Sequence, residues 1–176
     1  MHDCIATGGY IMDPNAVIEV FRRNVTEHYF DLKGRVSRQE FWYFVLASVV
    51  VYLAAAIIDS VLHTGLLGIV IGLALLLPMT GLGARRLQDT GRNGSLVWVW
   101  TISTVVMQII GLLAVLSGPV GAVGFLLFFA SIGVLISLVA LAASVALVYF
   151  CIQPGTPGPN DFGPVPDVGI TPPAKA

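Results

Sequence analysis

Long stretches in which nearly every residue is apolar alternate with short polar segments along this chain. About 20 consecutive apolar residues are enough for a helix to cross the hydrocarbon core of a bilayer. The pattern therefore predicts an all-α membrane protein, a bundle of four transmembrane helices at about residues 38–58, 66–86, 96–116 and 122–152. The last stretch is too long for the bilayer as one straight helix, so we expect it to tilt, to break within residues 121–133 or to project into water.

The polar segment at residues 83–95 divides the chain into two helical hairpins. Its charged residues are Arg85, Arg86, Asp89 and Arg92. Each of these would cost about 2.5 to 3.5 kcal/mol at the centre of a bilayer. We therefore expect this segment to be a loop that lies in or beside water.

Both ends of the chain differ from the predicted spans. Residues 1–12 show no periodicity and are expected to be disordered. Asp13 and Pro14 are typical of a helix start, and a short amphipathic helix follows to about Val25. Its apolar face could lie on the membrane surface or pack against the protein's own loops. Beyond Gln153, prolines and glycines predict an irregular tail, with residues 167–176 disordered, so that residues 13–166 form one membrane domain.

The residues just before the first span are typical of a helix start. Ser37 and Glu40 have the spacing of a capping box, in which each side chain binds the backbone amide of the other. Val36 and Phe41 have the spacing of a hydrophobic staple across the same helix end. These four residues are therefore interpreted as structural.

Composition and charge agree with a membrane protein. Hydrophobic residues make up 56% of the chain and charged residues only 11%, whereas globular chains carry about 25% charged residues. All lysines and arginines except one fall between Arg22 and Arg92, before the first span or after the second. The positive-inside rule places both basic segments in the cytoplasm, and four spans then place both termini there.

Few polar groups interrupt the spans. Asp59 and His63 flank the first turn at a spacing that would allow them to pair, and a metal-ligand role is not expected for them. Gln108 lies near the middle of the third span, where an amide most often forms a hydrogen bond between helices. Gly68 and Gly72 lie four residues apart in the second span and permit close approach of another helix.

Three ordered motifs resemble a known family. They are Phe30-x-x-x-Gly34-Arg35-x-Ser37-Arg38-x-Glu40-Phe41-Trp42, then Arg85-Arg86-Leu87-x-Asp89-Thr90-Gly91-Arg92-x-Gly94, then Pro154-Gly155 with Pro159-Asn160-x-Phe162-Gly163. The sequence resembles the bacterial family called domain of unknown function 805 from about His28 to Pro166. The resemblance implies location in the bacterial inner membrane, but it supplies no accepted activity.

The second motif departs from the family pattern at three places. Gln88 stands where the family tends to have histidine, Asn93 where serine is usual, and Ser95 with Leu96 where aromatic residues are usual. A histidine-dependent catalytic site in this motif is therefore not expected. The chain also lacks an HExxH motif, a nucleophile elbow and a glycine-rich phosphate loop, and Cys4 and Cys151 have no metal-like spacing.

The two basic motifs carry the functional hypothesis. The predicted site residues are Arg35, Arg38, Arg85, Arg86, Asp89 and Arg92. We expect them to meet at the cytoplasmic interface, with Arg38 and Arg85 flanking one site and Asp89 as the main counter-charge. Anionic lipid headgroups would then offset the loss of the Asp89 charge, because phosphates can replace a carboxylate there.

These observations favour a structural or interaction protein rather than an enzyme. Its arginine cluster would hold the two hairpins together and bind anionic headgroups or an acidic partner. The alternative is a small transporter or channel subunit that works as a homo-oligomer. Membrane lipids and a second copy of the chain are the expected partners; no nucleic acid, cofactor, metal or catalytic residue is predicted.

Overall fold

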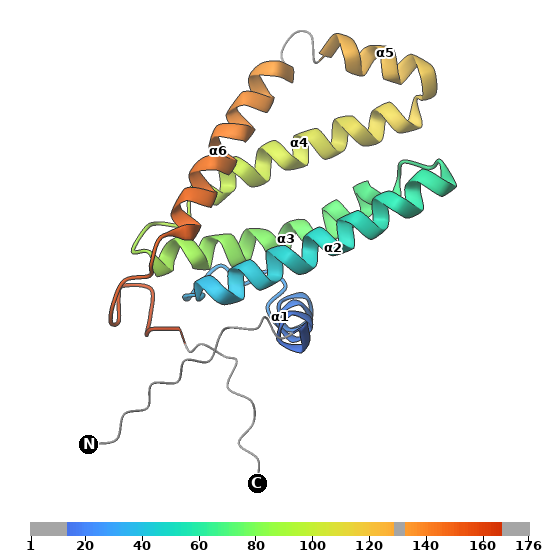
Figure 1. The fold of residues 1–176 in the computed structure, drawn as a ribbon. Coiled ribbons are helices and arrows are strands. Elements are labelled where there is room, and N and C mark those ends of the chain that lie inside the picture. Colours follow the sequence, from blue (N-terminus) through green and yellow to red (C-terminus); the bar gives the residue numbers. More distant parts are fainter. Residues whose placement is uncertain (1–13, 129–132, 167–176) are drawn as a thin grey trace, which may run out of the picture.

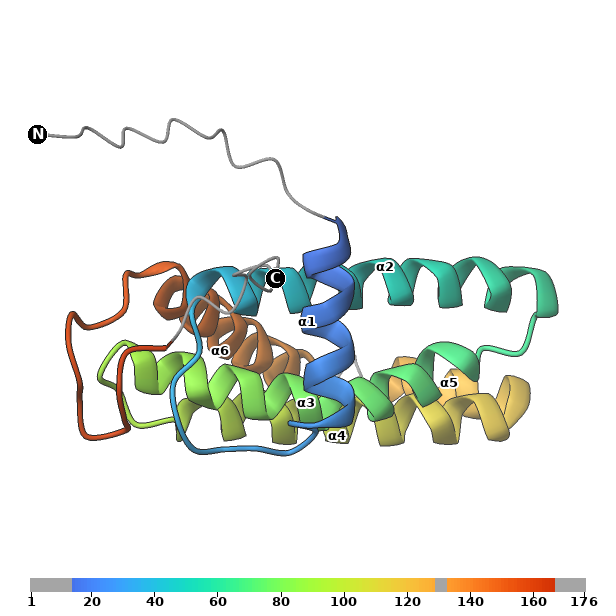
Figure 2. The ribbon, with the colours of Figure 1, turned by 90° about the horizontal axis from the view of Figure 1, so that it is seen from below.

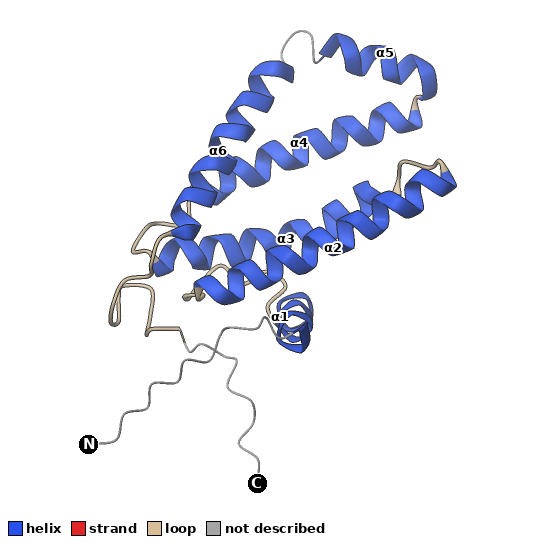
Figure 3. Ribbon diagram, in the orientation of Figure 1, coloured by secondary structure: helices blue, strands red, loops and turns tan. Residues whose placement is uncertain are grey.

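The computed structural model describes residues 14–128 and 133–166. It contains six helices in chain order within these ranges: α1 (Pro14–Thr26), α2 (Arg38–Leu62), α3 (Leu67–Asp89), α4 (Leu96–Leu116), α5 (Gly118–Phe128) and α6 (Val134–Ile152). Figure 3 shows the helices joined by loops, and the described residues form no strand. The disorder predicted for residues 1–12 and 167–176 and the helix-capping role predicted for Asp13 lie outside the described residues.

Four of these helices, α2, α3, α4 and α6, are long and apolar enough to cross a membrane. The prediction of an all-helical four-span membrane protein is thus confirmed. The last predicted span, residues 122–152, is not a single helix, and of the three alternatives predicted for it the break within residues 121–133 is the one that the structure shows. The stretch is divided into α5 and α6, and only α6, of 19 residues, has the length of a span.

The central polar segment is not wholly a loop, which corrects the prediction for residues 83–95. Helix α3 continues through its first seven residues and ends at Asp89, so the loop between the hairpins is residues 90–95. The insertion cost that predicted a loop assumes that a charged side chain faces lipid. Here Arg85 and Arg86 are instead buried by the protein, which supplies hydrogen-bond acceptors in place of water, and Arg92 lies exposed in the loop.

Helix α3 is the most buried of the spans and forms the centre of the bundle. It contacts α1, α2, α4 and α6, while α4 pairs with α6 and α5. Figure 1 shows the α2–α3 hairpin on one side and the α4, α5 and α6 helices on the other, converging where α3 ends. The two hairpins are therefore closest at the end of the molecule that carries the basic motifs.

Helix α1 lies crosswise to the spans, as Figures 1 and 2 show from two directions. Its apolar face packs on α2, where the rings of Phe21 and Phe44 stack with centroids 5.4 Å apart. Val20 is buried in the same core cluster, whereas Ile18 is 65% exposed. The two settings predicted for this helix were the membrane surface and the protein's own loops, whereas the structure shows it packed against a span of its own chain.

The opposite end of the α2–α3 hairpin is capped by Asp59. Its carboxylate accepts hydrogen bonds from the Thr64 hydroxyl at 2.6 Å and from the amides of Leu67 and Gly68 at 3.2 and 2.8 Å. These amides begin α3 and would otherwise have no partner inside the helix. Asp59 thus caps the start of α3. Its carboxylate binds these groups rather than the predicted partner His63, and the Nδ1 atom of His63 lies 3.0 Å from the Val61 carbonyl.

Gly72 lets α3 and α4 approach closely near mid-bundle. A Cβ atom at this position would collide with the side-chain amide of Gln108 from α4 and would lie 3.1 Å from the Tyr52 hydroxyl of α2. A larger residue would therefore force these helices apart. Close approach was predicted at Gly72 and a position between helices was predicted for Gln108. In the structure these two residues contact one another.

Candidate functional site

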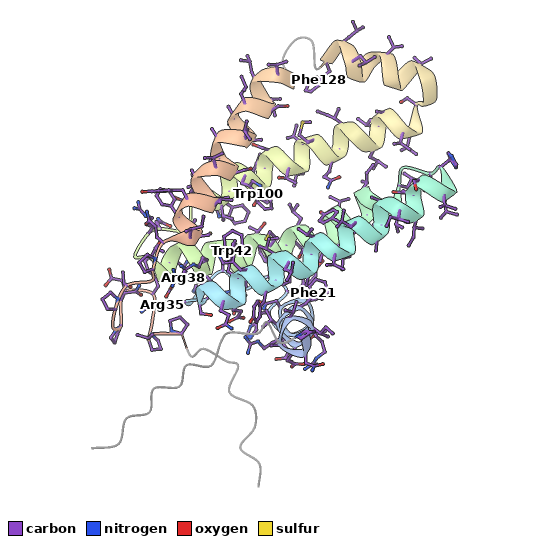
Figure 4. All side chains as sticks on the ribbon, viewed as in Figure 1. Phe21, Arg35, Arg38, Trp42, Trp100 and Phe128 are labelled. Carbon is purple, nitrogen blue, oxygen red and sulfur yellow. The ribbon has the colours of Figure 1, made fainter. Side chains whose placement is uncertain are left out.

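The basic motifs meet where α2 begins and α3 ends, and we call this region the arginine end. The loop at residues 90–95 and the irregular residues 153–166, which we call the C-terminal segment, also lie here (Figure 1). Figure 4 shows Arg35 and Arg38 at this end of the molecule. Segments from both hairpins and from the chain after the last span therefore share one site.

Asp89 is the central acid of the arginine end. Its carboxylate accepts hydrogen bonds from Arg35 at 2.9 Å and from Arg86, one helical turn earlier in α3. All three side chains are at most 4% exposed. A buried carboxylate between two guanidinium groups holds the segment before α2 against the end of α3.

The two arginines also bind backbone carbonyls of the C-terminal segment. Arg35 donates to the carbonyls of Gly158 at 2.7 Å and Thr156 at 2.8 Å. Arg86 donates to Cys151 at the end of α6, at 3.1 Å, and to Gln153. Irregular backbone has carbonyls that no helix uses, and these replace water around the buried cations.

The C-terminal segment is attached to α3 through its own polar groups. The Thr156 amide donates to the Asp89 carbonyl at 2.8 Å, and the Asn160 side chain donates to the Gln88 carbonyl at 3.0 Å. Gly155 packs so closely that a Cβ atom there would collide with the Asp89 carboxylate. The glycine and asparagine of the third motif thus have a geometric role: they let the C-terminal segment cover the ion pairs.

A second network joins α1 to the hairpin. Arg85 donates to the Oδ1 of Asn24 at 2.9 Å, and the amide nitrogen of Asn24 lies 3.2 Å from Glu40, which also pairs with Arg23 at 2.7 Å. Asn24 is fully buried and Arg85 is 6% exposed. The capping box is realised only from one side: the Ser37 hydroxyl accepts from the Glu40 amide at 3.2 Å, while the Glu40 carboxylate faces α1.

Three cations of the arginine end remain exposed. They are Lys33, Arg38 and Arg92. Arg38 makes one long hydrogen bond, 3.4 Å, to the Ile152 carbonyl, and Arg92 lies 4.0 Å from the centre of the Phe150 ring. Within the described residues, none of the three forms an ion pair with a carboxylate.

The predicted site residues therefore gather at one end but separate into groups with different partners. Arg35, Arg86 and Asp89 form a buried cluster, whereas Arg38 and Arg92 face outward. Arg38 contacts α6 and Arg85 contacts α1, so the two arginines have different partners, and the shared site that they were predicted to flank stays a prediction. The burial that separates them comes from α1 and the C-terminal segment.

Sequence reasoning missed the partners of these arginines. Asn24 was an ordinary polar residue of a short amphipathic helix, and Thr156 and Gly158 contribute only backbone carbonyls. Backbone acceptors leave no pattern in a sequence. The one available signal was the third motif itself, which indicates that the proline-rich stretch after α6 is not an arbitrary tail.

The cysteines and the acidic and histidine side chains were the candidates for a metal site. No group of three or more histidine, cysteine, aspartate or glutamate side chains is placed to hold a metal ion in the described part of the chain. Cys151 is buried and free, and Cys4 lies outside the described residues. Gln88 of the second motif donates to the Leu32 carbonyl at 2.9 Å and so fixes the loop before α2.

Comparison with known proteins identifies the family. The profile of the family described as "Protein of unknown function (DUF805)" matches residues 29–164. The chain belongs to this family. The DUF805 match begins after α1 and ends within the C-terminal segment, so it includes all three motifs and the whole Asp89 cluster.

Two Escherichia coli relatives are similar over most of their length. The inner membrane protein YhaH of strain K12 is 30% identical over 148 residues, which cover 81% of this chain and 92% of YhaH. The inner membrane protein YhaI of the same strain is 30% identical over 148 residues, covering 83% of this chain and 94% of YhaI. No solved structure shows a significant match. With four apolar helices, this DUF805 protein is a multi-pass protein of the bacterial inner membrane.

Proposed function

We propose that this DUF805 protein is a structural or interaction protein of the membrane rather than an enzyme. Its buried arginine cluster would hold the two hairpins together, and its exposed cations would contact anionic headgroups or an acidic partner at the cytoplasmic face. The observation that carries this proposal is that some cations of the arginine end have a carboxylate partner and others have none. Arg35 and Arg86 are enclosed by a carboxylate and by backbone carbonyls, whereas Arg38 and Arg92 have no carboxylate partner among the described residues.

The structural part of the proposal rests on the number of segments that meet at Asp89. The segment before α2, the end of α3 and the C-terminal segment all contact this carboxylate or its two arginines. Elsewhere the two hairpins meet mainly through apolar side chains, together with the Gly72–Gln108 contact and a hydrogen bond of 2.9 Å between the hydroxyls of Thr80 and Thr101. Apolar contacts gain little in lipid because acyl chains are equally apolar. Buried ionic contacts at one end are then an efficient means of fixing the relative position of the hairpins.

Binding of anions follows from the remaining charge. Each lysine or arginine near an anionic membrane surface contributes about 1 kcal/mol of attraction. Lys33, Arg38 and Arg92 all belong to the arginine end and are exposed. We therefore expect the melting temperature of the protein in mixed micelles to rise as phosphatidylglycerol replaces a zwitterionic lipid.

Replacing all three by glutamine (Lys33→Gln, Arg38→Gln, Arg92→Gln) should abolish that rise. The matched control is the single variant Arg22→Gln, which removes an exposed arginine that is paired with Glu19 on α1. A rise that is equal in the triple variant and in the wild type would contradict headgroup binding and would leave an acidic protein as the partner to seek.

Orientation is tested independently. Reporters fused after Ala176 and inserted at Asn93 should both give a cytoplasmic signal, because the basic segments stay on that side. A periplasmic signal from either reporter would overturn the proposed topology. Flux of ions or small solutes through proteoliposomes that contain the protein would favour the transporter alternative. The sequence gives that alternative little support, because Asp59 is the only Asp, Glu, Lys or Arg in residues 41–84 and residues 93–160 contain none.

A further inference from the structure

A cavity of about 160 Å³ lies between the two hairpins close to the arginine end. All four spans contribute to it, and its lining includes Trp42, Met79, Trp100, Ser144, Leu147 and Val148. Figure 4 shows Trp42 on α2 and Trp100 on α4 facing one another across the space between the hairpins. The lining is almost entirely apolar, so the cavity is suited to a hydrocarbon rather than to water.

Its position beside Arg38 adds a charge to this apolar space. Arg38, Trp42 and Val45 are spaced four and three residues apart, so they lie along one face of α2, with Arg38 at the outer end. Trp42 and Val45 line the cavity. Cys151 also lines it, and the next carbonyl, that of Ile152, accepts the single hydrogen bond of Arg38.

The guanidinium of Arg38 lacks an anion here. It is exposed, has no carboxylate partner among the described residues, and lies close enough to Arg86 for the two cations to repel one another. Asp89, the acid of the buried cluster, is already paired with Arg35 and Arg86. An anion at Arg38 would therefore satisfy a charge that the protein leaves open.

We propose that this cavity is a binding site for one anionic phospholipid, with its phosphate at Arg38 and the first part of an acyl chain between Trp42 and Trp100. Val148 is 47% exposed at the border of the cavity, so a lipid can enter sideways from the bilayer. An apolar cavity of this size holds a molecule about as large as benzene, or about six carbons of a chain. The inference deepens the proposed headgroup binding by assigning it to one site.

The test is native mass spectrometry of the protein after exposure to equal amounts of phosphatidylglycerol and phosphatidylcholine. The wild type should retain one lipid, with phosphatidylglycerol preferred. Arg38→Gln should retain a lipid but lose the preference by about fivefold, the value of one cation near a phosphate. Ser144→Phe, which fills the cavity from α6, should retain neither lipid. Controls are Arg22→Gln and Ala142→Phe, an exposed position on the same helix, and both should behave like the wild type.

A second measurement needs no substitution. Phosphatidylglycerol brominated near its headgroup should quench the fluorescence of the wild type at a low mole fraction, and unbrominated phosphatidylglycerol should reverse the quenching, whereas phosphatidylcholine and soluble glycerol phosphate should not. Equal lipid retention by Ser144→Phe, an unchanged preference in Arg38→Gln, or displacement by glycerol phosphate would overturn the site. If melting temperatures still rise with phosphatidylglycerol after such a failure, general headgroup binding stands and only this cavity is excluded.

Discussion

Replacing Asp89 with asparagine removes the only carboxylate in the buried cluster while keeping its shape. In the native protein this carboxylate lies between Arg35 and Arg86, and the side chains of the three residues are 4%, 2% and 0% exposed. The variant keeps one carbonyl oxygen as an acceptor, so a hydrogen bond to one arginine can remain. The second guanidinium loses its partner, and both positive charges lose their compensation.

Removing one partner from a buried ion pair costs about 3 to 5 kcal/mol. Because asparagine preserves one hydrogen bond and carbonyls of the C-terminal segment remain, we expect a loss near the lower limit, about 3 kcal/mol. Sequence alone suggested that anionic lipid would reduce this loss. The structure changes that expectation, because the two arginines are covered by protein and a headgroup phosphate cannot reach them.

The assay is unfolding of the purified protein by titration with sodium dodecyl sulfate, followed by circular dichroism, once in neutral detergent and once with phosphatidylglycerol present. Asp89→Asn should shift the transition by the same amount in both. Asp161→Asn, an exposed acid of the C-terminal segment, is the matched control and should leave the transition unchanged. A loss of less than about 1 kcal/mol, or rescue by phosphatidylglycerol, would refute the role assigned to burial here.

Two further substitutions test local geometry with the same unfolding assay. Ser37→Ala should cost about 1 kcal/mol because it removes the cap of α2, whereas Ser95→Ala should be neutral, since this serine precedes α4 without a side-chain cap bond; equal losses would contradict the capping assignment. Gly155→Ala should cost about 1 to 3 kcal/mol because the new methyl group collides with the Asp89 carboxylate, which two arginines hold in place. Gly124→Ala in α5 has open space around it and should show no loss; a neutral Gly155→Ala would show that the carboxylate can move aside.

The membrane spans could be predicted because hydrocarbon thickness and backbone hydrogen bonding leave a sequence few alternatives. The hairpin arrangement followed from the central polar segment, and the resemblance to DUF805 followed from three motifs. The end of α3 could not be predicted in the same way. An insertion scale compares the free energy of a side chain in lipid with that in water. The Arg86 side chain lies in neither, because its N–H groups donate to the carbonyls of Cys151 and Gln153.

The candidate site was predicted by residue type but not by partner. Asp89 was expected to compensate several arginines, and in the structure two arginines converge on it. Glu40 was assigned to a capping box from its spacing to Ser37, yet its carboxylate pairs with Arg23. Local spacing shows which hydrogen bonds a helix end can form. The position of α1, which is fixed by apolar contacts such as Phe21 on Phe44, determines that the Glu40 carboxylate binds α1 instead.

The contacts of Arg35 with residues 156 and 158 span more than 120 positions of the chain, which has a consequence for biogenesis. A ribosome releases the first hairpin long before it makes the residues whose carbonyls surround Arg35 and Arg86. Until then these two side chains need water or other hydrogen-bond acceptors, so the hairpin cannot reach its final depth in the bilayer on its own. The arginine end can therefore pack fully only after the C-terminal segment has been made. A chain that lacks this segment would keep arginine side chains without their carbonyl partners.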